Sequence, residues 1–169
     1  MQFQELIRAR RSIRGYRPDP VPEAALRRIL EAARLAPTAA NRQPFQLIVV
    51  TDAAVRRQLR AVYDREWFWT APMILVGCAE PAKAWQRFDG FNSAEVDLSI
   101  VMDHVVLAAT DEGLGTCWIC HFDEPKLKPI LGIPADVRVI AMTPLGYAAA
   151  EPSAFQRKPL VELVRRERW

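Results

Sequence analysis

The chain has 169 residues, of which 50% are hydrophobic and 25% are charged, so it can form one domain with a substantial core. The formal net charge of +3 is modest, and no basic stripe with interleaved aromatic residues is present, so we expect no nucleic-acid partner. No apolar run reaches the roughly 18 unbroken residues that a membrane helix needs, so we expect no membrane partner either.

The cysteines and the first residues favour a cytoplasmic protein. Three cysteines, an odd number in a chain of this size, fit a reducing compartment better than a disulfide framework. Residues 1–5 show no basic region followed by an apolar one, so we expect no secretory signal.

The spacing of apolar residues predicts a series of helices and strands. Helices are predicted from Phe3 to the basic residues that follow Ile7, from Pro22 to Pro37, from Thr51 or Asp52 to Val62, over 94–109, from Asp123 to Gly132 and over 160–166. Strands are predicted over 45–50, 73–79, 116–122 and 137–145. Residues 81–93 are the least regular part of the chain, and we expect a mobile loop there.

The stretch from Ala94 to Phe122 is the centre of the predicted fold. Its first half lacks Gly and Pro and is apolar on nearly all sides, which predicts a long helix buried in the core. Gly113 or Gly115 ends this helix, and the β-branched and aromatic residues that follow predict a buried strand. Because helices and strands interleave without a regular βαβ period, we expect an α+β fold. It would be a single domain over residues 1–169, with a small mixed, mostly antiparallel sheet surrounded by helices.

Three arginines and a serine gather at the end of the first predicted helix: Arg10, Arg11, Ser12 and Arg14. The planar fork of guanidinium donors matches phosphate oxygens, which suggests an anion site. Alternatively, the positive charges simply oppose the dipole at the helix C-terminus. Arg157, far away in the sequence, could converge on the same anion or could be solvated near the chain end.

The loop from Pro37 to Pro44 concentrates polar groups between two prolines. Its backbone and side-chain donors suit recognition of the edge of a planar heterocycle, which needs donors and acceptors in fixed places. A plain turn is the alternative, since the same residue types are common in turns.

Several familiar motifs are excluded. Gly113-x-Gly115 lacks the third glycine of a dinucleotide fingerprint and follows a helix rather than a strand. Cys117 and Cys120 on a strand would point to opposite faces, which favours two small apolar residues on a buried strand over a redox pair or a zinc site. We therefore expect no metal. No G-x-S-x-G elbow and no Ser-His-Asp pattern is present.

Four segments together resemble the FMN-dependent nitroreductase family, in the family's order and over nearly the whole chain. They are residues 10–14 (RRSIR), 36–45 (APTAANRQPF), 113–119 (GLGTCWI), and Gly146-Tyr147 followed by residues 157–160 (RKPL). The resemblance implies a homodimer with FMN bound at the subunit interface. It also implies an oxidoreductase that passes reducing equivalents from NADH or NADPH to a small electron-poor acceptor, such as a nitroaromatic or a quinone, in a ping-pong reaction.

The family motifs place particular residues at the cofactor. Arg10 and Ser12 would hold the FMN phosphate, and Arg11 belongs to the same motif. Arg14 would lie near N1 and O2 of the ring, where positive charge stabilises reduced flavin. Arg157 matches a second phosphate ligand. The loop that a partner subunit lays against the flavin comprises Pro37, Thr38, Ala39 and Asn41. The strand end that passes flavin N5 comprises Trp118, Ile119, Cys120 and His121.

The chain departs from the family at two places in this site. Phe155 stands where relatives often carry a basic residue, two positions before Arg157. Cys120 and His121 stand where close relatives tend to have a small pair, so only their backbone is expected to serve N5. The His121 ring could protonate a reduced acceptor near neutral pH, or it could point away as a bystander. Two alternative functions therefore stay open: a flavin-destructase or dehalogenase-like branch of the same fold, and a flavin-binding dimer without turnover.

Overall fold

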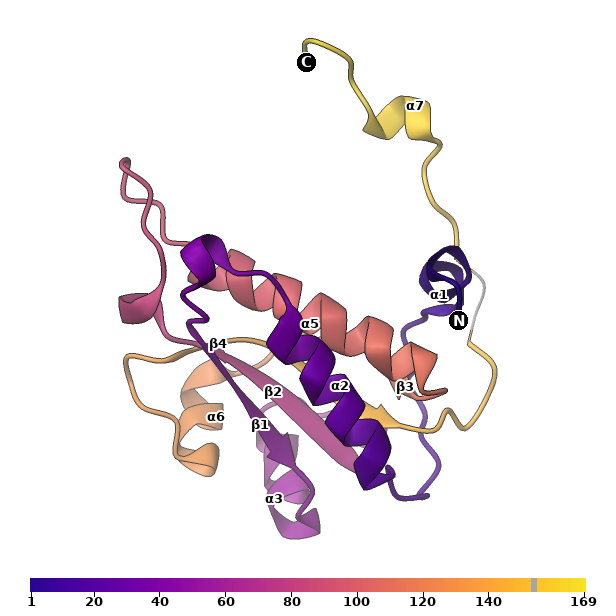
Figure 1. The fold of residues 1–169 in the computed structure, drawn as a ribbon. Helices are drawn as coiled ribbons and strands as arrows, with labels where there is room; N and C mark the ends of the chain where they lie inside the picture. The colour runs from indigo at the N-terminus through magenta and orange to yellow at the C-terminus, as the bar shows by residue number, and fades with distance from the viewer. Residues whose placement is uncertain (153–154) are drawn as a thin grey trace.

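The computed structural model describes residues 1–152 and 155–169, and Figure 1 traces the chain. Its helices are α1 (Phe3–Ala9), α2 (Glu23–Leu35), α3 (Ala53–Gln58), α4 (Glu66–Trp69), α5 (Ala94–Asp111), α6 (Glu124–Leu131) and α7 (Leu160–Leu163). Short 3-10 turns are η1 (Ala39–Asn41), η2 (Leu59–Ala61) and η3 (Pro81–Lys83). The strands are β1 (Phe45–Val50), β2 (Met73–Ala79), β3 (Gly115–Thr116) and β4 (Arg138–Gly146).

The strands form one sheet in the order β1-β2-β4-β3, and every pair of neighbours is antiparallel. In register, Met73 of β2 lies opposite Leu145 of β4. At the β3 edge, Ser12 forms a parallel bridge with Thr116, so the N-terminal segment continues the sheet. The predicted α+β class, with a small and mostly antiparallel sheet surrounded by helices, is confirmed.

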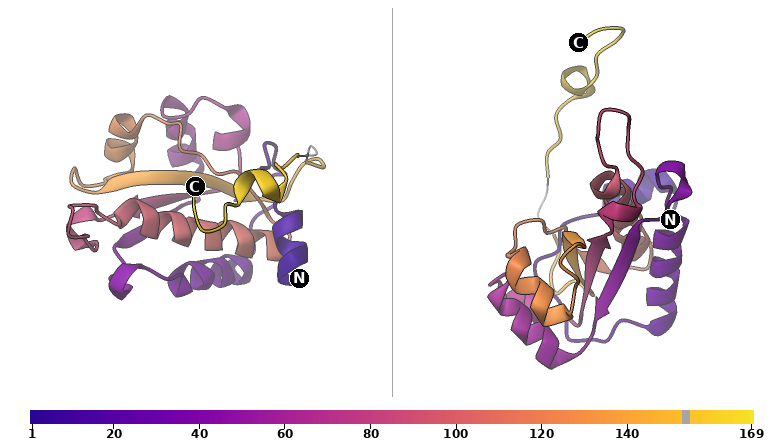
Figure 2. Two further views of the ribbon diagram at one scale, coloured as in Figure 1. Left: turned by 90° about the horizontal axis from the view of Figure 1, so that it is seen from above. Right: turned by 90° about the vertical axis from the view of Figure 1, so that its left-hand side faces the viewer.

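Helices cover both faces of the sheet, as the left view of Figure 2 shows. Side chains alternate between the faces along β2. Met73 and Leu75 join a core cluster with α2 and α5, whereas Ile74 and Val76 join a second cluster with η2, α4 and α6. The sheet therefore separates two hydrophobic cores.

The long helix α5 is the buried element that the sequence predicts. Leu98, Val101 and Met102 are fully buried against the sheet and α2. Close approach to β2 is possible because Gly77 has no side chain: a Cβ there would come within 3.0 Å of the Met102 sulfur. The helix leaves one side uncovered, where Val96 is 49% exposed.

Two predicted elements are shorter than expected. The strand predicted over 116–122 ends at Thr116. The reason is that the Cys117 N–H donates to Thr143 Oγ1 (3.0 Å) and not to a backbone carbonyl, so pairing resumes only as an isolated bridge between Ile119 and Met142. The helix predicted over 160–166 is only the four-residue α7. It is exposed throughout, so no packing extends it.

The predicted loop over 81–93 also has some regular structure. It contains η3 and a bridge between Gln86 and Asn92, with Phe88 fully exposed at the tip. The segment that follows β4 begins with a bridge between Tyr16 and Ala148, and its residues 153 and 154 lie outside the described part of the chain.

The C-terminal segment extends away from the body of the protein (Figure 1). Leu160 and Val161 are 76% and 77% exposed, and Trp169 is fully exposed. Exposed apolar side chains gathered in this way usually mark a surface that another molecule covers. No helix among the described residues is long and apolar enough to cross a membrane.

Candidate active site

The predicted anion-binding segment is fixed to the edge of the sheet. The Ile13 N–H donates to the Thr116 carbonyl (2.8 Å), and the Ile13 side chain is buried, 8% exposed. Because side chains alternate along an extended segment, Ser12 and Arg14 lie on the side opposite Ile13 and are exposed. The fold thus holds the Ser12 hydroxyl and the Arg14 guanidinium on one accessible side.

Positive charge gathers beside the buried thiol of Cys117. Burial raises the pKa of this thiol, while the charge of Arg14, the Ser12 side chain and the charge of Arg10 oppose that rise. These three side chains therefore converge on one place. Among the described residues, no carboxylate forms an ion pair with Arg10 or Arg14. Their charge remains available to an anionic ligand.

A small hollow opens next to this cluster. It measures about 260 Å³ and is lined by Ser12, Ile13, Arg14, Gly15, Ala150, Glu151 and Pro152. The lining joins the N-terminal segment to the chain that follows β4. The Ala149 N–H holds the two together by donating to the Gly15 carbonyl (2.9 Å).

Arg11 is oriented differently from its neighbours. Its Nη1 donates to the carbonyl of Arg8 and to that of Arg10 (2.9 Å for Arg10), at the C-terminal end of α1. Its guanidinium carbon also lies 4.0 Å from the centre of the Phe155 ring. This geometry favours the helix-end explanation for Arg11, which the sequence left open, over direct contact with an anion.

The loop over 37–44 is strained and internally bonded. Ala40, Asn41 and Gln43 have φ values of 51°, 53° and 51°, which is uncommon for residues other than glycine. The Gln43 N–H donates to Thr38 Oγ1 (3.0 Å), which helps to hold this shape. Non-glycine residues in such conformations cost free energy and cluster at functional sites, so the loop is more than a plain turn.

A buried carboxylate anchors this loop to α5. Asp97 is 2% exposed, and its Oδ1 accepts the Ala39 N–H (2.8 Å) while its Oδ2 accepts the Ser93 hydroxyl (2.7 Å). Asp97 was not among the predicted site residues. The available signal was a carboxylate between Val96 and Leu98 in the apolar run of α5, which must find partners when it is buried.

The predicted strand end over 118–121 alternates between buried and exposed side chains. Ile119 is buried and pairs with Met142, whereas Cys120 and His121 are exposed. The Trp118 indole N–H points to Cys120 Sγ (3.0 Å). Cys117 is buried and Cys120 exposed, so the expectation of two buried cysteines is wrong for Cys120. No group of metal-ligating side chains occurs in the described part of the chain.

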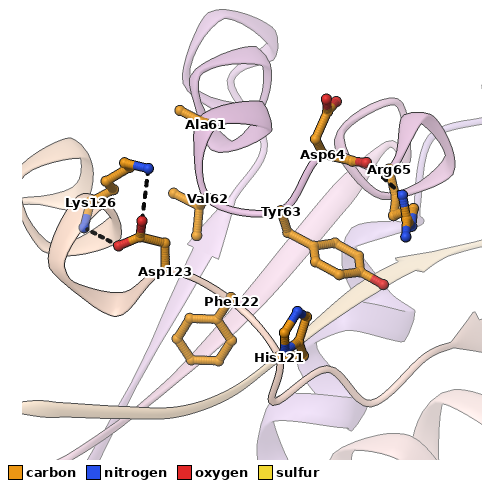
Figure 3. Close-up of a pocket in the computed structure, with 9 residues that line it drawn as sticks. All are labelled: Ala61, Val62, Tyr63, Asp64, Arg65, His121, Phe122, Asp123 and Lys126. Carbon is orange, nitrogen blue, oxygen red and sulfur yellow. Dashed lines mark hydrogen bonds and ion pairs between the residues drawn. The ribbon is translucent and has the colours of Figure 1, made fainter.

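His121 lines a pocket of about 530 Å³ that sequence reasoning missed (Figure 3). Figure 3 shows the His121 ring and the Tyr63 ring facing the same opening, with Phe122 beside them. Edge-on contacts with Phe68 (5.3 Å between ring centres) and Trp67 (5.8 Å) fix the Tyr63 ring. The pocket is a long-range product of the fold, since the Asp123 N–H donates to the Val62 carbonyl (3.1 Å) and joins its two walls.

The structure brings some of the predicted site residues together and keeps others apart. Arg157 is exposed, and its guanidinium carbon lies 4.4 Å from the centre of the Phe155 ring, so Phe155 links it to Arg11. The 37–44 loop is tied to Asp97 near the start of α5, whereas the N-terminal amine pairs with Asp111 at its end. At 1.5 Å per residue, Asp97 and Asp111 are about 21 Å apart.

Comparison with known proteins agrees with this architecture. A model of the nitroreductase family matches residues 7–64 and 59–147. An NADH dehydrogenase of Thermus thermophilus is 34% identical over an alignment 186 positions long, which covers 92% of this chain and 91% of that protein. The chain belongs to the nitroreductase family. The resemblance drawn from the four sequence segments is therefore confirmed, and so is the expectation of an oxidoreductase.

Solved structures of nitroreductases share the whole fold. A nitroreductase family protein from Clostridium difficile 630 is 33% identical, with a TM-score of 0.92 and complete coverage of both chains. An FMN-dependent nitroreductase from Clostridium difficile R20291 is 25% identical, with a TM-score of 0.84 over 97% of this chain and 98% of that one. The nitroreductase fold therefore accounts for nearly every described element.

Proposed function

We propose that this nitroreductase family member is an FMN-dependent NAD(P)H oxidoreductase that reduces small electron-poor acceptors, such as nitroaromatics or quinones, in a ping-pong reaction. The observation that carries the proposal is the convergence of Arg10, Ser12 and Arg14 at the sheet edge, where no described carboxylate forms an ion pair with either arginine. FMN as cofactor is supported by the FMN-dependent relative from Clostridium difficile R20291.

The donor set fits a phosphate group. Two guanidiniums and a hydroxyl offer charge-assisted and neutral hydrogen bonds to a dianion, and the open hollow beside Ser12 and Arg14 gives it access. The predicted N5 segment, Trp118 to His121, directly follows Cys117. Four extended residues span at most about 14 Å. The arginine cluster and the His121 pocket are therefore close enough for one ligand to place its phosphate at the first and its ring at the second.

FMN supplies the hydride-accepting and hydride-donating chemistry. The chain's own contribution is to hold and orient. Arg10, Ser12 and Arg14 bind the phosphate end, and the backbone over 120–121 offers an N–H donor at the ring end. The pocket between Tyr63 and His121 then provides an aromatic wall against which a planar acceptor can lie.

A homodimer completes the site in this proposal. In one chain the strained 37–44 loop is tied to Asp97 near the start of α5, whereas the arginine segment pairs with β3, which follows the end of α5, so closing both around one ring would take a second copy of the chain. The exposed side of α5 at Val96 and the apolar C-terminal segment provide surfaces that a second copy would cover. Obligate interfaces of this kind bury on the order of 2,000 Å² or more.

The test is the visible spectrum of the purified protein before and after anaerobic addition of NADH and, separately, NADPH. We expect a bound-flavin spectrum that bleaches with at least one donor and returns on addition of a quinone or a nitroaromatic. A flavin spectrum that neither donor bleaches would favour the binding dimer without turnover. Halide release from a halogenated phenol, with no quinone reduction, would favour the dehalogenase-like branch. A colourless protein that takes up no added FMN would contradict the proposal.

A further inference from the structure

Phe155 joins two arginines that lie far apart in the sequence. The guanidinium carbon of Arg11 is 4.0 Å from the centre of its ring, and that of Arg157 is 4.4 Å away. Both distances are well inside the range in which a cation is attracted to the electron-rich face of an aromatic ring. The ring is 40% exposed, so it is not there to fill a core.

This arrangement is the main contact that orders Arg157. Among the described residues, its one hydrogen-bond partner is the carbonyl of the adjacent Gln156 (3.3 Å), which cannot fix the side chain relative to the body of the protein. Arg11, in contrast, is anchored by the carbonyls at the end of α1. Through the Phe155 ring, the fixed Arg11 therefore limits where the otherwise exposed Arg157 can lie.

The charges around the stack point to an anion. Within the part of the chain that the structure describes, neither Arg11 nor Arg157 pairs with a carboxylate. Two guanidiniums that share one ring repel each other, and a dianion nearby would remove that cost. Arg10 and Arg14, on either side of Arg11 in sequence, belong to the cluster beside Cys117.

We propose that Phe155 is a positioning residue for the phosphate site. Its ring stacks with both Arg11 and Arg157 and so holds Arg157 in place to bind the phosphate of the cofactor. Arg11 anchors this stack and is not itself a phosphate ligand. The inference rests on the proposed FMN function. It assigns separate roles to two arginines that the sequence alone does not distinguish.

The test compares the binding of FMN and riboflavin, which lacks the phosphate, to flavin-free protein by fluorescence titration. Phe155→Leu keeps an apolar side chain but removes the aromatic face. We expect it to weaken FMN binding roughly two- to fivefold, the size of one exposed cation–π contact, and to leave riboflavin binding unchanged. Phe155→Tyr should restore FMN binding. Phe91→Leu is a matched control, since it removes a similar stack with Arg87 (4.8 Å) in the 86–92 loop.

Combining substitutions separates positioning from a general structural effect. In an Arg157→Ala background, Phe155→Leu should cause no further loss of FMN affinity, because the ring acts through Arg157. Three outcomes would overturn the role of Phe155 without affecting the proposed function. They are a further loss of FMN affinity in the Arg157→Ala background, equal losses for FMN and riboflavin in Phe155→Leu, and an unchanged FMN affinity in Phe155→Leu. Failure of the unaltered chain to bind FMN would overturn the proposed function as well.

Discussion

The two segments that supply arginines to the proposed phosphate site are held in opposite ways. The N-terminal segment is tied to β3 through the Ile13 N–H, and the Tyr16 hydroxyl donates to the Ile13 carbonyl (2.8 Å). The C-terminal segment from Phe155 to Trp169 is exposed at every residue. One half of the site, the N-terminal segment, is therefore fixed to the sheet. The other half, the exposed C-terminal segment, is tied to the body of the chain through the stacking of Phe155 with Arg11 and Arg157.

This difference indicates a division of labour. The fixed half binds the phosphate without a free-energy cost for ordering the chain. A segment that becomes ordered only when two chains assemble would instead couple phosphate binding to the presence of a second copy of the chain. The apolar residues beyond Arg157, above all Leu160 and Val161, fit the second role.

The largest effect is expected from removing residues 160–169. If this exposed apolar segment covers a second copy, its deletion should convert a dimer into a monomer at micromolar concentration and weaken FMN binding by at least about 100-fold, or roughly 2.8 kcal/mol. Sedimentation and flavin titration measure the two effects. Phe88→Ala is the control, since it removes an equally exposed side chain from the 86–92 loop. A truncated chain that still sediments as a dimer with full FMN affinity would contradict the role given to this segment.

Next in size is the loss of an arginine from the fixed half. Arg10→Ala should weaken FMN binding by about 1.5–3 kcal/mol, the scale of a hydrogen bond to a charged group. Arg157→Ala should weaken it less, because part of its binding free energy is spent on ordering an exposed side chain. Riboflavin should respond little to either change. Equal losses for FMN and riboflavin would show that neither arginine contacts the phosphate.

A smaller effect should follow from loosening the fixed half without touching an arginine. In Gly115→Ala the new Cβ would come within 2.6 Å of the Ile13 side chain, so Ile13 must move and the 12–14 segment with it. Overpacking of this kind costs about 1–3 kcal/mol, and we expect a lower free energy of unfolding together with weaker FMN binding. Gly15→Ala is the matched control, because its Cβ would meet only Ala149 at 3.8 Å. Thermal unfolding that is the same for both variants would show that the segment is not held tightly.

The sequence predicts the fixed half well and the long-range contacts poorly. The apolar run of α5 and the clustered arginines are local patterns, so both could be found without a structure. The anchoring of Ala39 by Asp97 joins residues 58 positions apart. Likewise, β3 is short because a hydroxyl on β4, from Thr143, takes the place of a backbone acceptor. Such contacts depend on which elements meet in space, and periodicity carries no information about that.

The smallest effect is expected at His121, where the 116–122 segment leaves the fixed edge of the sheet and reaches the exposed pocket. Its ring faces the opening shared with Tyr63 (Figure 3), a position from which it can donate a proton to a quinone as that acceptor is reduced. We expect His121→Ala to slow the oxidative half-reaction with a quinone, measured by stopped flow. A one-electron acceptor that takes up no proton should react at the same rate with either protein. The loss of rate should stay below about tenfold, less than the 10²–10⁴ typical of general acids, because water can replace an exposed side chain. His104→Gln on α5, whose ring nitrogen Nδ1 lies 2.9 Å from the Ile100 carbonyl, controls for loss of an imidazole elsewhere. An unchanged rate with the quinone in His121→Ala would assign the chemistry at this end of the site to the backbone over 120–121 alone.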